Sequence, residues 1–292
     1  MTNSLIVILF FGLSLSVSAQ IIKVQDDAGN EINIERAAKR VVALSPHIVE
    51  LLYAVGGENN IIAAVDYSNY PDAAKKLPRV GSGFKLDIEA IVGLKPDLII
   101  AWKSGNNQMQ LETIKKLGFK LYLSEPKNLQ GIAKNLRDIG ELIGHKKTGE
   151  DKSRFFINEL NKLTNNKHHL NRPRVFYQVW EQPLFTVNGQ HMISQIIELC
   201  GGENVFKELS VLSPQVDIES VISRNPDVIV VGVSNASKDW LKNWNKWASI
   251  NAVKNNQLYG IDADLIVRHT PRILQGVHLM CEHIEKVRSL KN

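Results

Sequence analysis

Short runs of β-branched and other apolar residues alternate along the chain with segments in which apolar residues recur every three to four positions. The runs predict buried strands, and the segments predict amphipathic helices. We expect strands at residues 40–44, 61–65, 98–101, 120–123, 174–178, 228–231 and 258–260. Because strands and helices alternate, the pattern predicts an α/β fold with mainly parallel sheets that helices cover on both faces.

The second half of the chain repeats two stretches of the first half in the same order. Residues 49–59 resemble residues 194–204, and residues 86–100 resemble residues 216–230. In the second pair, an Asp suited to capping precedes a short helical pattern, a Pro ends it, and a β-branched strand follows. The repeat predicts two lobes of related construction.

A charged stretch with helical spacing separates the two halves. Its apolar positions predict two helices that are broken near Gly144–Gly149, the second of which crosses between the lobes. We therefore expect an N-terminal lobe at residues 20–128, a helical connector at residues 129–170 and a C-terminal lobe at residues 171–292. A helical connection is expected to restrict hinge motion.

The N-terminus carries an apolar run, Leu5–Leu15, that is too short to span a bilayer comfortably. Small residues follow at 17–19, where a signal peptidase would cut, so residues 1–19 are expected to be a signal peptide. The mature protein is then expected to be soluble in the periplasm. Residues 1–4 contain no Lys or Arg, which leaves an N-terminal membrane anchor as the alternative.

Composition and motifs exclude several classes of function. The net charge is +5, but no dense block of Lys and Arg suggests nucleic-acid binding. A Walker A motif, a Gly-x-Ser-x-Gly elbow and a His-Glu-x-x-His helix are all absent from the sequence, so we expect no catalytic residues and no catalytic cofactor. His47, His191 and His269 could approach the space between the lobes, but a site for free metal is not expected.

The sequence contains two cysteines, Cys200 and Cys281. An even number of cysteines in an exported chain favours a disulfide. Two buried free thiols are the alternative.

Aromatic and polar residues gather directly after the predicted strands. They are Ser45, Pro46, Tyr67, Phe84 and Trp102 in the first half, and Trp180, Phe185, Asp264 and Arg268 in the second. Parallel α/β sheets bind ligands at the carboxyl ends of their strands, so this set predicts a ligand cleft between the lobes. Its composition suits a large, flat, partly apolar ligand. Asp264 and Arg268 could instead form a surface ion pair on a helix, and we interpret Trp240, Trp244 and Trp247 as packing or cleft-edge residues on one helix face.

Several motifs resemble the periplasmic cobalamin-binding proteins of ABC importers. They are Leu44-Ser45-Pro46, Tyr67-Ser68-Asn69-Tyr70-Pro71, residues 94–102, residues 200–206, Pro214-Gln215-Val216 and Thr270-Pro271-Arg272-Ile273. The resemblance implies two Rossmann-like lobes joined by a long rigid helix, and a monomer that holds cobalamin or a related corrinoid as its ligand. Matching ligand positions are Tyr67, Trp102, Asp264 and Arg268, and a Cys200–Cys281 disulfide is implied as well. Haem- and siderophore-binding relatives share the Lys-Pro-Asp element at 95–97, so these ligands are the alternative.

The resemblance also implies a contact with the membrane subunits of the importer. Members of this family dock through one carboxylate on each lobe, and the matching positions are Glu89 and Glu219, which the repeat places at equivalent sites. The alternative is that each Glu only interacts with the dipole of its own helix. The chain departs from the family in the loop after Val80, where Gly83 and Phe84 replace an expected Trp, and at Ser213, where another Trp is expected.

Overall fold

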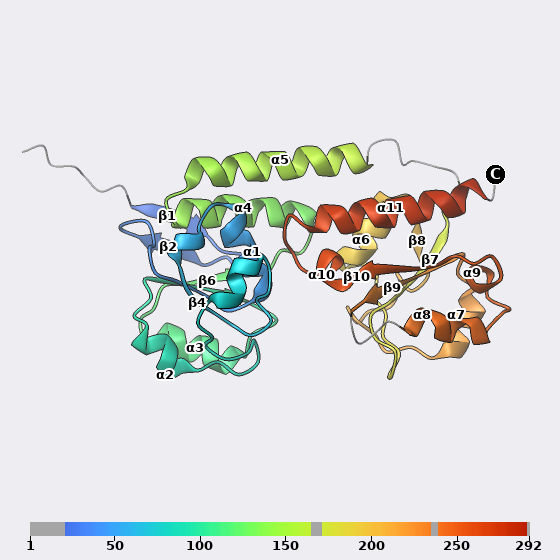
Figure 1. Ribbon diagram of the computed structural model, residues 1–292, viewed down its shortest axis with the longest axis horizontal. Coiled ribbons are helices and arrows are strands. Elements are labelled where there is room, and N and C mark those ends of the chain that lie inside the picture. Colours follow the sequence, from blue (N-terminus) through green and yellow to red (C-terminus); the bar gives the residue numbers. More distant parts are fainter. Residues whose placement is uncertain (1–20, 165–170, 235–238, 291–292) are drawn as a thin grey trace, which may run out of the picture.

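The computed structural model describes residues 21–164, 171–234 and 239–290. Two α/β lobes lie side by side beneath a layer of long helices (Figure 1). The predicted signal peptide lies outside the described residues, as do residues 165–170 of the predicted connector. Within the part of the chain that the structure describes, no helix is both long and apolar enough to cross a membrane.

The first lobe is built on a parallel sheet with the strand order β4-β3-β5-β6. The strands are β3 (Val41–Ala43), β4 (Ile61–Ala64), β5 (Leu98–Trp102) and β6 (Leu121–Ser124). Its helices are α1 (Pro46–Ala54), η1 (Glu58–Asn60), η2 (Asp72–Lys76), α2 (Ile88–Gly93) and α3 (Gln108–Lys116). The two central strands, β3 and β5, are buried except for Trp102, as expected for a sheet covered on both faces.

The second lobe repeats this arrangement. Its parallel sheet has the order β10-β9-β7-β8, which is the order of the first lobe read from the opposite edge. The strands are β7 (Arg174–Gln178), β8 (Glu203–Asn204), β9 (Val228–Val233) and β10 (Leu258–Asp262). The helices are α6 (Met192–Leu199), α7 (Ile218–Arg224), α8 (Trp240–Asn243), η4 (Trp244–Lys246), α9 (Asn251–Lys254), α10 (Ala263–Ile266) and α11 (Ile273–Ser289). The predicted pair of related lobes with parallel sheets is confirmed.

An antiparallel hairpin, β1 (Ile22–Gln25) with β2 (Glu31–Ile34), precedes the first lobe and was not predicted. Asp26, which is 3% exposed, orders its turn by accepting hydrogen bonds from the backbone N–H groups of Ala28 and Asn30 at 2.9 and 2.8 Å. Each strand is only four residues long, which is too short for the alternation of burial in the pattern to predict it.

The predicted pair of connecting helices is present as α4 (Leu129–Leu142) and α5 (Lys146–Thr164). The break falls at residues 143–145, and Gly149 lies inside α5 rather than in the break. A Cβ on Gly140 would lie 2.8 Å from the Cα of Gly149, so this glycine pair lets the two helices approach closely. Helix α5 packs on α4 of the first lobe and on α11 of the second, and so connects the lobes (Figure 1).

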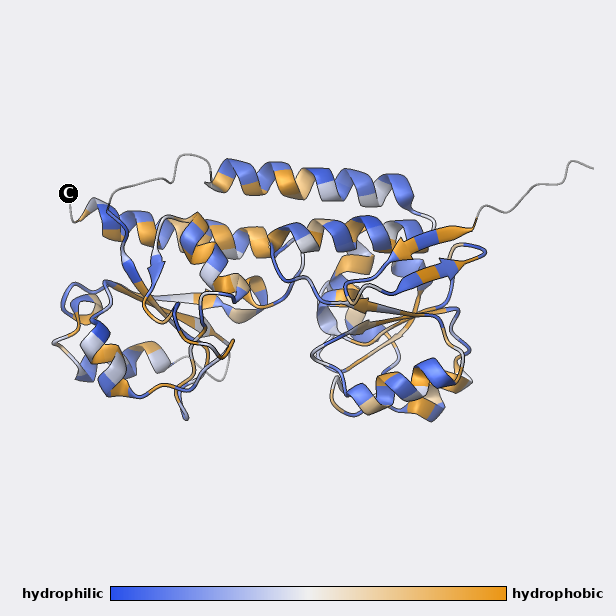
Figure 2. Ribbon diagram, turned by 180° about the vertical axis from the view of Figure 1, so that it is seen from behind, coloured by the Kyte–Doolittle hydropathy of each residue, from blue (hydrophilic) through white to orange (hydrophobic). Residues whose placement is uncertain are grey.

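The hydrophobic core follows these layers. One buried cluster runs beneath the helical layer through both lobes, and the opposite face of each sheet has a cluster of its own. In Figure 2 the sheet strands are largely hydrophobic, whereas α5 presents many hydrophilic residues. Trp244 is buried against Phe176, as the packing interpretation predicted, but α8 ends before it and η4 begins there, so the three tryptophans do not lie on a single α-helix.

The predicted disulfide is present. Cys200 at the end of α6 is bonded to Cys281 in α11, with 4.6 Å between the two Cα atoms. Arg288 of the same helix donates hydrogen bonds to the carbonyl oxygens of Cys200 and Gly201 at 3.1 and 3.0 Å. The bond therefore fastens the covering helix α11 to the second lobe.

Candidate functional site

Ser45 and Pro46 lie where β3 passes into α1. Pro46 occupies the first turn of the helix, where its missing N–H is not needed. The hydroxyl of Ser45 does not cap the helix but lies 2.7 Å from Nδ1 of His47, whose Nε2 is 3.3 Å from Oγ of Ser124. Burial lowers the pKa of His47 well below its ordinary value, and His269 and Arg268 lower it further, so this imidazole is neutral near pH 7.

Trp102, the last residue of β5, is fixed by a buried asparagine. The backbone N–H of Trp102 donates to Oδ1 of Asn106 at 2.7 Å, and the Asn106 amide donates to the carbonyls of Leu44 and Gly83 at 2.8 and 2.9 Å. Three strand-end loops are thereby tied together. The indole Nε1 of Trp102 is buried and has no hydrogen-bond partner among the described residues. An unpaired buried donor is costly, so this group suits a ligand acceptor.

The loop after β4 presents Tyr67, whose side chain is 82% exposed. Its backbone has φ +63°, a left-handed conformation that is uncommon outside glycine and is often found at functional sites. Arg79 supports the loop from within by donating to the carbonyls of Val65, Ser68 and Ala74 at 3.2, 2.9 and 3.1 Å. The buried hydroxyl of Ser68 has no partner in the described part of the chain.

The other predicted aromatic residues lie on both lobes. Phe84 is 82% exposed in the loop before α2, and Trp180 is 50% exposed after β7. The rings of Trp180 and Trp240 form a T-shaped pair with 5.2 Å between centroids, and the backbone of Phe185 forms isolated antiparallel β-bridges with Trp180 and with Gln215. Large exposed apolar groups in strand-end loops are available for contact with a ligand or a partner.

Arg268 joins the two lobes. It forms the predicted ion pair with Asp264 at 2.9 Å, but this is only one of its contacts. Its Nη1 also donates to Oε1 of Glu50 at 2.9 Å and to Oδ1 of Asn69 at 2.8 Å, both in the first lobe. Figure 1 shows α1 of the first lobe facing α10 of the second. The ion pair of Asp264 and Arg268 is therefore part of the interlobe junction rather than an isolated surface ion pair.

Three histidines gather near this junction. The rings of His47 and His269 are 6.1 Å apart, and burial lowers the pKa of His269 to about 4. Burial, with a contribution from His269, also lowers the pKa of His191 to about 4, and its Nδ1 accepts a hydrogen bond from the backbone of Ile193. The ring of His269 has no hydrogen-bond partner among the described residues. All three imidazoles are neutral near pH 7, but among the described residues no group of three or more His, Cys, Asp or Glu side chains could hold a metal ion.

Glu89 and Glu219 lie in the first turns of α2 and α7. Asp87 and Asp217 cap these helices by accepting from the backbone N–H groups of Ala90 and Ser220 at 2.9 and 2.6 Å. Both glutamates are exposed, and neither is in an ion pair among the described residues. Figure 1 places α2 and α7 on the same side of the molecule, opposite the layer formed by α4, α5 and α11.

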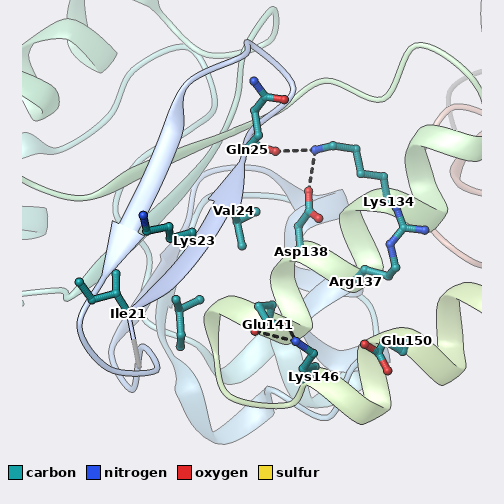
Figure 3. A pocket seen from close by; sticks show the side chains of 11 residues that line it. Ile21, Lys23, Val24, Gln25, Lys134, Arg137, Asp138, Glu141, Lys146 and Glu150 are labelled. Atoms are coloured by element: carbon teal, nitrogen blue, oxygen red, sulfur yellow. Dashed lines mark hydrogen bonds and ion pairs between the residues drawn. The ribbon is translucent and has the colours of Figure 1, made fainter. Parts of the chain in front are cut away.

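A separate groove of about 750 Å³ lies on the first lobe between β1, α4 and α5 (Figure 3). Two ion pairs lie within its lining: Lys134 is 2.6 Å from Asp138, and Lys146 is 3.0 Å from Glu141. No predicted ligand residue lines it. The groove is thus distinct from the set of residues at the interlobe junction.

Sequence reasoning missed the residues that organise the junction, above all Glu50, Arg79 and Asn106. Glu50 had a usable signal, because it is a single charge within the apolar run Ile48–Leu52 of a predicted buried helix. A charged residue in such a position is almost never fully buried unless it is paired. Arg79 and Asn106 lie in loops, where the sequence offers no periodic pattern from which to infer burial.

Comparisons with a family model, with curated proteins and with solved structures find the same kind of relative. Residues 41–265 match the model of the family described as periplasmic binding protein. The chain is 37% identical over 250 residues to a vitamin B12-binding protein of Vibrio vulnificus, a match that covers 85% of this chain and 91% of the relative. The crystal structure of the periplasmic vitamin B12 binding protein of Vibrio cholerae is 35% identical, with a TM-score of 0.80, and the match covers 86% of this chain and 98% of that one.

More distant structures share the fold alone. A periplasmic heme-binding protein of Roseiflexus has a TM-score of 0.76 at 20% identity, with 86% of this chain and 99% of that one covered. The family match spans most of the chain, and the relatives above 30% identity cover both lobes. The chain belongs to the periplasmic binding protein family, in the group that contains the vitamin B12-binding proteins.

Proposed function

We propose that this protein captures cobalamin or a related corrinoid between its lobes and delivers it to an ABC importer. The observation that carries the proposal is Trp102, an aromatic group at the interlobe junction whose buried N–H lacks a partner among the described residues. A corrinoid offers both a large apolar face and many amide carbonyls, and so matches such a group. The identity with vitamin B12-binding relatives supports the same ligand.

In this proposal, the ligand lies in a cleft between residues 20–128 and residues 171–292, with residues 129–170 as the connector. Ser45, Pro46, Tyr67, Phe84 and Trp102 contact it from the first lobe, and Trp180, Phe185, Asp264 and Arg268 contact it from the second. The exposed aromatic rings pack against the corrin, while Asp264 and Arg268 bond its polar edge. No chemistry is performed on the ligand.

Delivery takes place in the periplasm, after removal of residues 1–19, and the protein acts as a monomer. Glu89 and Glu219 bind cationic residues of the two membrane subunits. Their equivalent positions on related lobes would match a symmetric pair of subunits. Because α5 packs on helices of both lobes, free hinge opening is restricted, and release of the ligand requires docking.

Titration calorimetry of the mature protein with cyanocobalamin tests the ligand. We expect stoichiometric binding with a submicromolar dissociation constant, lost in Trp102→Ala. Phe155→Ala is the matched control, since this aromatic residue is 60% exposed on α5, away from the junction. Equal affinities of the two variants would contradict the placement of the site, and no binding to the unmodified protein would contradict the ligand.

Haem is the second candidate, and His269 favours it. Its imidazole is neutral near pH 7 and unpartnered among the described residues, which is the state required of an axial ligand to iron. A parallel titration with haem, followed by absorbance in the Soret region, distinguishes the two. Haem binding that His269→Ala removes, without cobalamin binding, would move the proposed ligand to haem and keep the transport role.

A further inference from the structure

Glu50 is a buried carboxylate whose hydrogen-bond donors among the described residues all come from the opposite lobe. It lies in α1 of the first lobe and is 4% exposed. Its Oε1 accepts from Arg268 Nη1 at 2.9 Å and from Arg272 Nη1 at 3.1 Å, and its Oε2 accepts from the hydroxyl of Thr270 at 2.9 Å. One short segment of the second lobe, residues 268–272, thus supplies every donor.

Both arginines reach further into the first lobe. Arg268 donates to Asn69 at 2.8 Å, and the guanidinium of Arg272 lies 3.9 Å above the ring centre of Tyr70, in cation–π geometry. Asn69 and Tyr70 belong to the same loop as Tyr67, a proposed ligand residue. The network therefore connects α1, the loop after β4 and the turn before α11.

The energetics of burial make Glu50 the central member of this network. Its side chain is 2% exposed, and those of Arg268 and Arg272 are 12% and 19% exposed. A buried ion is tolerated when paired, but removal of one partner leaves the others charged and unpaired in a poorly hydrated site. Without Glu50, two guanidinium groups would be left facing the first lobe, and separation of the lobes would rehydrate them.

Both terminal nitrogens of Arg268 are engaged at the junction. The two Nη1 hydrogens go to Glu50 and Asn69, and Nη2 bonds Asp264. The other Nη2 contact, to the carbonyl of Tyr67, is long at 3.5 Å. A guanidinium held in this way has a fixed orientation and retains a weakly engaged donor for a ligand.

We propose that Glu50 is a positioning residue for the ligand site: it holds Arg268, and through it Asp264, against the Tyr67 loop, so that the two halves of the site are assembled before the ligand arrives. This inference rests on the proposed binding of a corrinoid between the lobes. When the site is already assembled, the ligand does not have to order its side chains and loops, which would cost free energy. Loss of this preassembly therefore lowers the affinity even when the ligand contacts are unchanged.

The test combines affinity with a distance between the lobes. Spin labels at Lys116→Cys in α3 and Lys254→Cys in α9, both exposed positions, report the separation of the lobes in the free protein. Glu50→Gln is expected to broaden this distribution toward longer distances and to weaken cyanocobalamin binding at least tenfold. Saturating cyanocobalamin should restore the original distribution, and an unchanged far-UV circular dichroism spectrum of the free variant separates opening of the lobes from a general loss of stability.

Matched variants separate the possible outcomes. Asp151→Asn removes a carboxylate whose one ion-pair partner among the described residues is the exposed Arg154, and should leave the distribution and the affinity unchanged. In the Glu50→Gln protein the positive charge of Arg272 has lost its partner. The double variant Glu50→Gln, Arg272→Gln removes this charge and should recover part of the affinity for cyanocobalamin. If Glu50→Gln does not fold, Arg272→Gln alone removes one of the contacts to Glu50 from the side of the second lobe, and should broaden the distance distribution in the same way.

Unchanged distances and affinity in Glu50→Gln would overturn the proposal, as would broadening without loss of affinity. If the unmodified protein does not bind cyanocobalamin, the proposed function fails, and the positioning of a corrinoid site fails with it. A broadened distance distribution in Glu50→Gln would then still show that the contacts of Glu50 with residues 268–272 hold the lobes together.

Discussion

The backbone of Gly105 lies directly against the indole of Trp102. A Cβ on Gly105 would be 1.9 Å from Cε3 and 2.3 Å from Cδ2 of the ring, far inside contact distance. The position of Trp102 therefore depends on the absence of a side chain three residues later. The next residue, Asn106, accepts a hydrogen bond from the backbone N–H of Trp102. The short turn at residues 102–106 therefore determines both the backbone position and the ring orientation of Trp102.

Gly105→Ala is therefore expected to displace Trp102 and weaken cyanocobalamin binding by about tenfold or more, with little change in fold. The new methyl group cannot be accommodated unless the indole moves. Calorimetry measures the affinity, and tryptophan fluorescence reports the displaced ring. Gly93→Ala is the matched control, since a Cβ there meets nothing within 4 Å. Equal affinities of the two variants would show that the orientation of Trp102 is not critical.

Glu89→Gln and Glu219→Gln are expected to weaken association with the importer while cyanocobalamin binding stays unchanged. Both side chains are exposed and neither is a proposed ligand residue, so their proposed role is electrostatic. Each variant should lower the association rate several-fold, and the double variant should lower it further, with a weaker dependence on salt. Surface plasmon resonance on the reconstituted importer measures these rates.

An exposed carboxylate elsewhere on the first lobe, Glu112, provides the control for docking. Glu112→Gln removes an exposed charge from α3 and should leave the association rate nearly unchanged. An equal effect of Glu112→Gln would indicate a response to net charge alone, and an unaffected Glu89→Gln, Glu219→Gln double variant would contradict the docking role.

Periodic patterns explain which parts of the fold could be predicted from the sequence. All seven predicted strands are present, because each is a compact apolar run in a parallel sheet. The hairpin β1–β2 and the two-residue strand β8 were missed, since such short strands carry no distinctive pattern. Gly149 was assigned to a break because glycine usually ends helices, whereas its role is to let α5 approach Gly140.

The strand-end location of the candidate residues could be predicted, but their contacts with one another could not, and their role in ligand binding stays a prediction. Strand-end positions identified Tyr67, Trp102 and Arg268, because topology alone brings the carboxyl ends of parallel strands together. The partners of these residues depend on tertiary distances between segments far apart in sequence. Glu50 and Arg268 are separated by 218 positions, so no local pattern could have paired them.

Loss of the Cys200–Cys281 bond is expected to lower the free energy of unfolding by about 4–5 kcal/mol in the chain-entropy model. The bond spans 81 positions and fastens α11, which packs on α5, α6 and β10. Urea denaturation of Cys200→Ser with Cys281→Ser, compared with the oxidised protein, measures the change. Cyanocobalamin affinity of the folded double variant should stay within a few-fold of the original, because neither cysteine is a proposed ligand residue.

Acidification is expected to destabilise the folded protein through its buried histidines. Burial lowers the folded-state pKa of both His191 and His269 to about 4, whereas an unfolded histidine titrates near 6.5. Between these values the unfolded chain binds more protons than the folded protein. Stability conferred by the neutral imidazoles is therefore complete above about pH 6.5 and is lost as the pH falls toward 4.

The pH dependence of His269→Gln isolates this contribution. Each buried histidine adds a slope of up to about 1.4 kcal/mol per pH unit in this window, so His269→Gln should flatten the fall in stability measured by urea denaturation at pH 7 to 4.5. His278→Gln, which replaces an exposed histidine on α11, should retain the original slope. Carboxylates contribute equally to all three proteins and cancel in the comparison. Identical slopes for His269→Gln and the unmodified protein would mean that folding does not lower the pKa of His269, and the buried, neutral imidazole would then not be a source of the acid sensitivity.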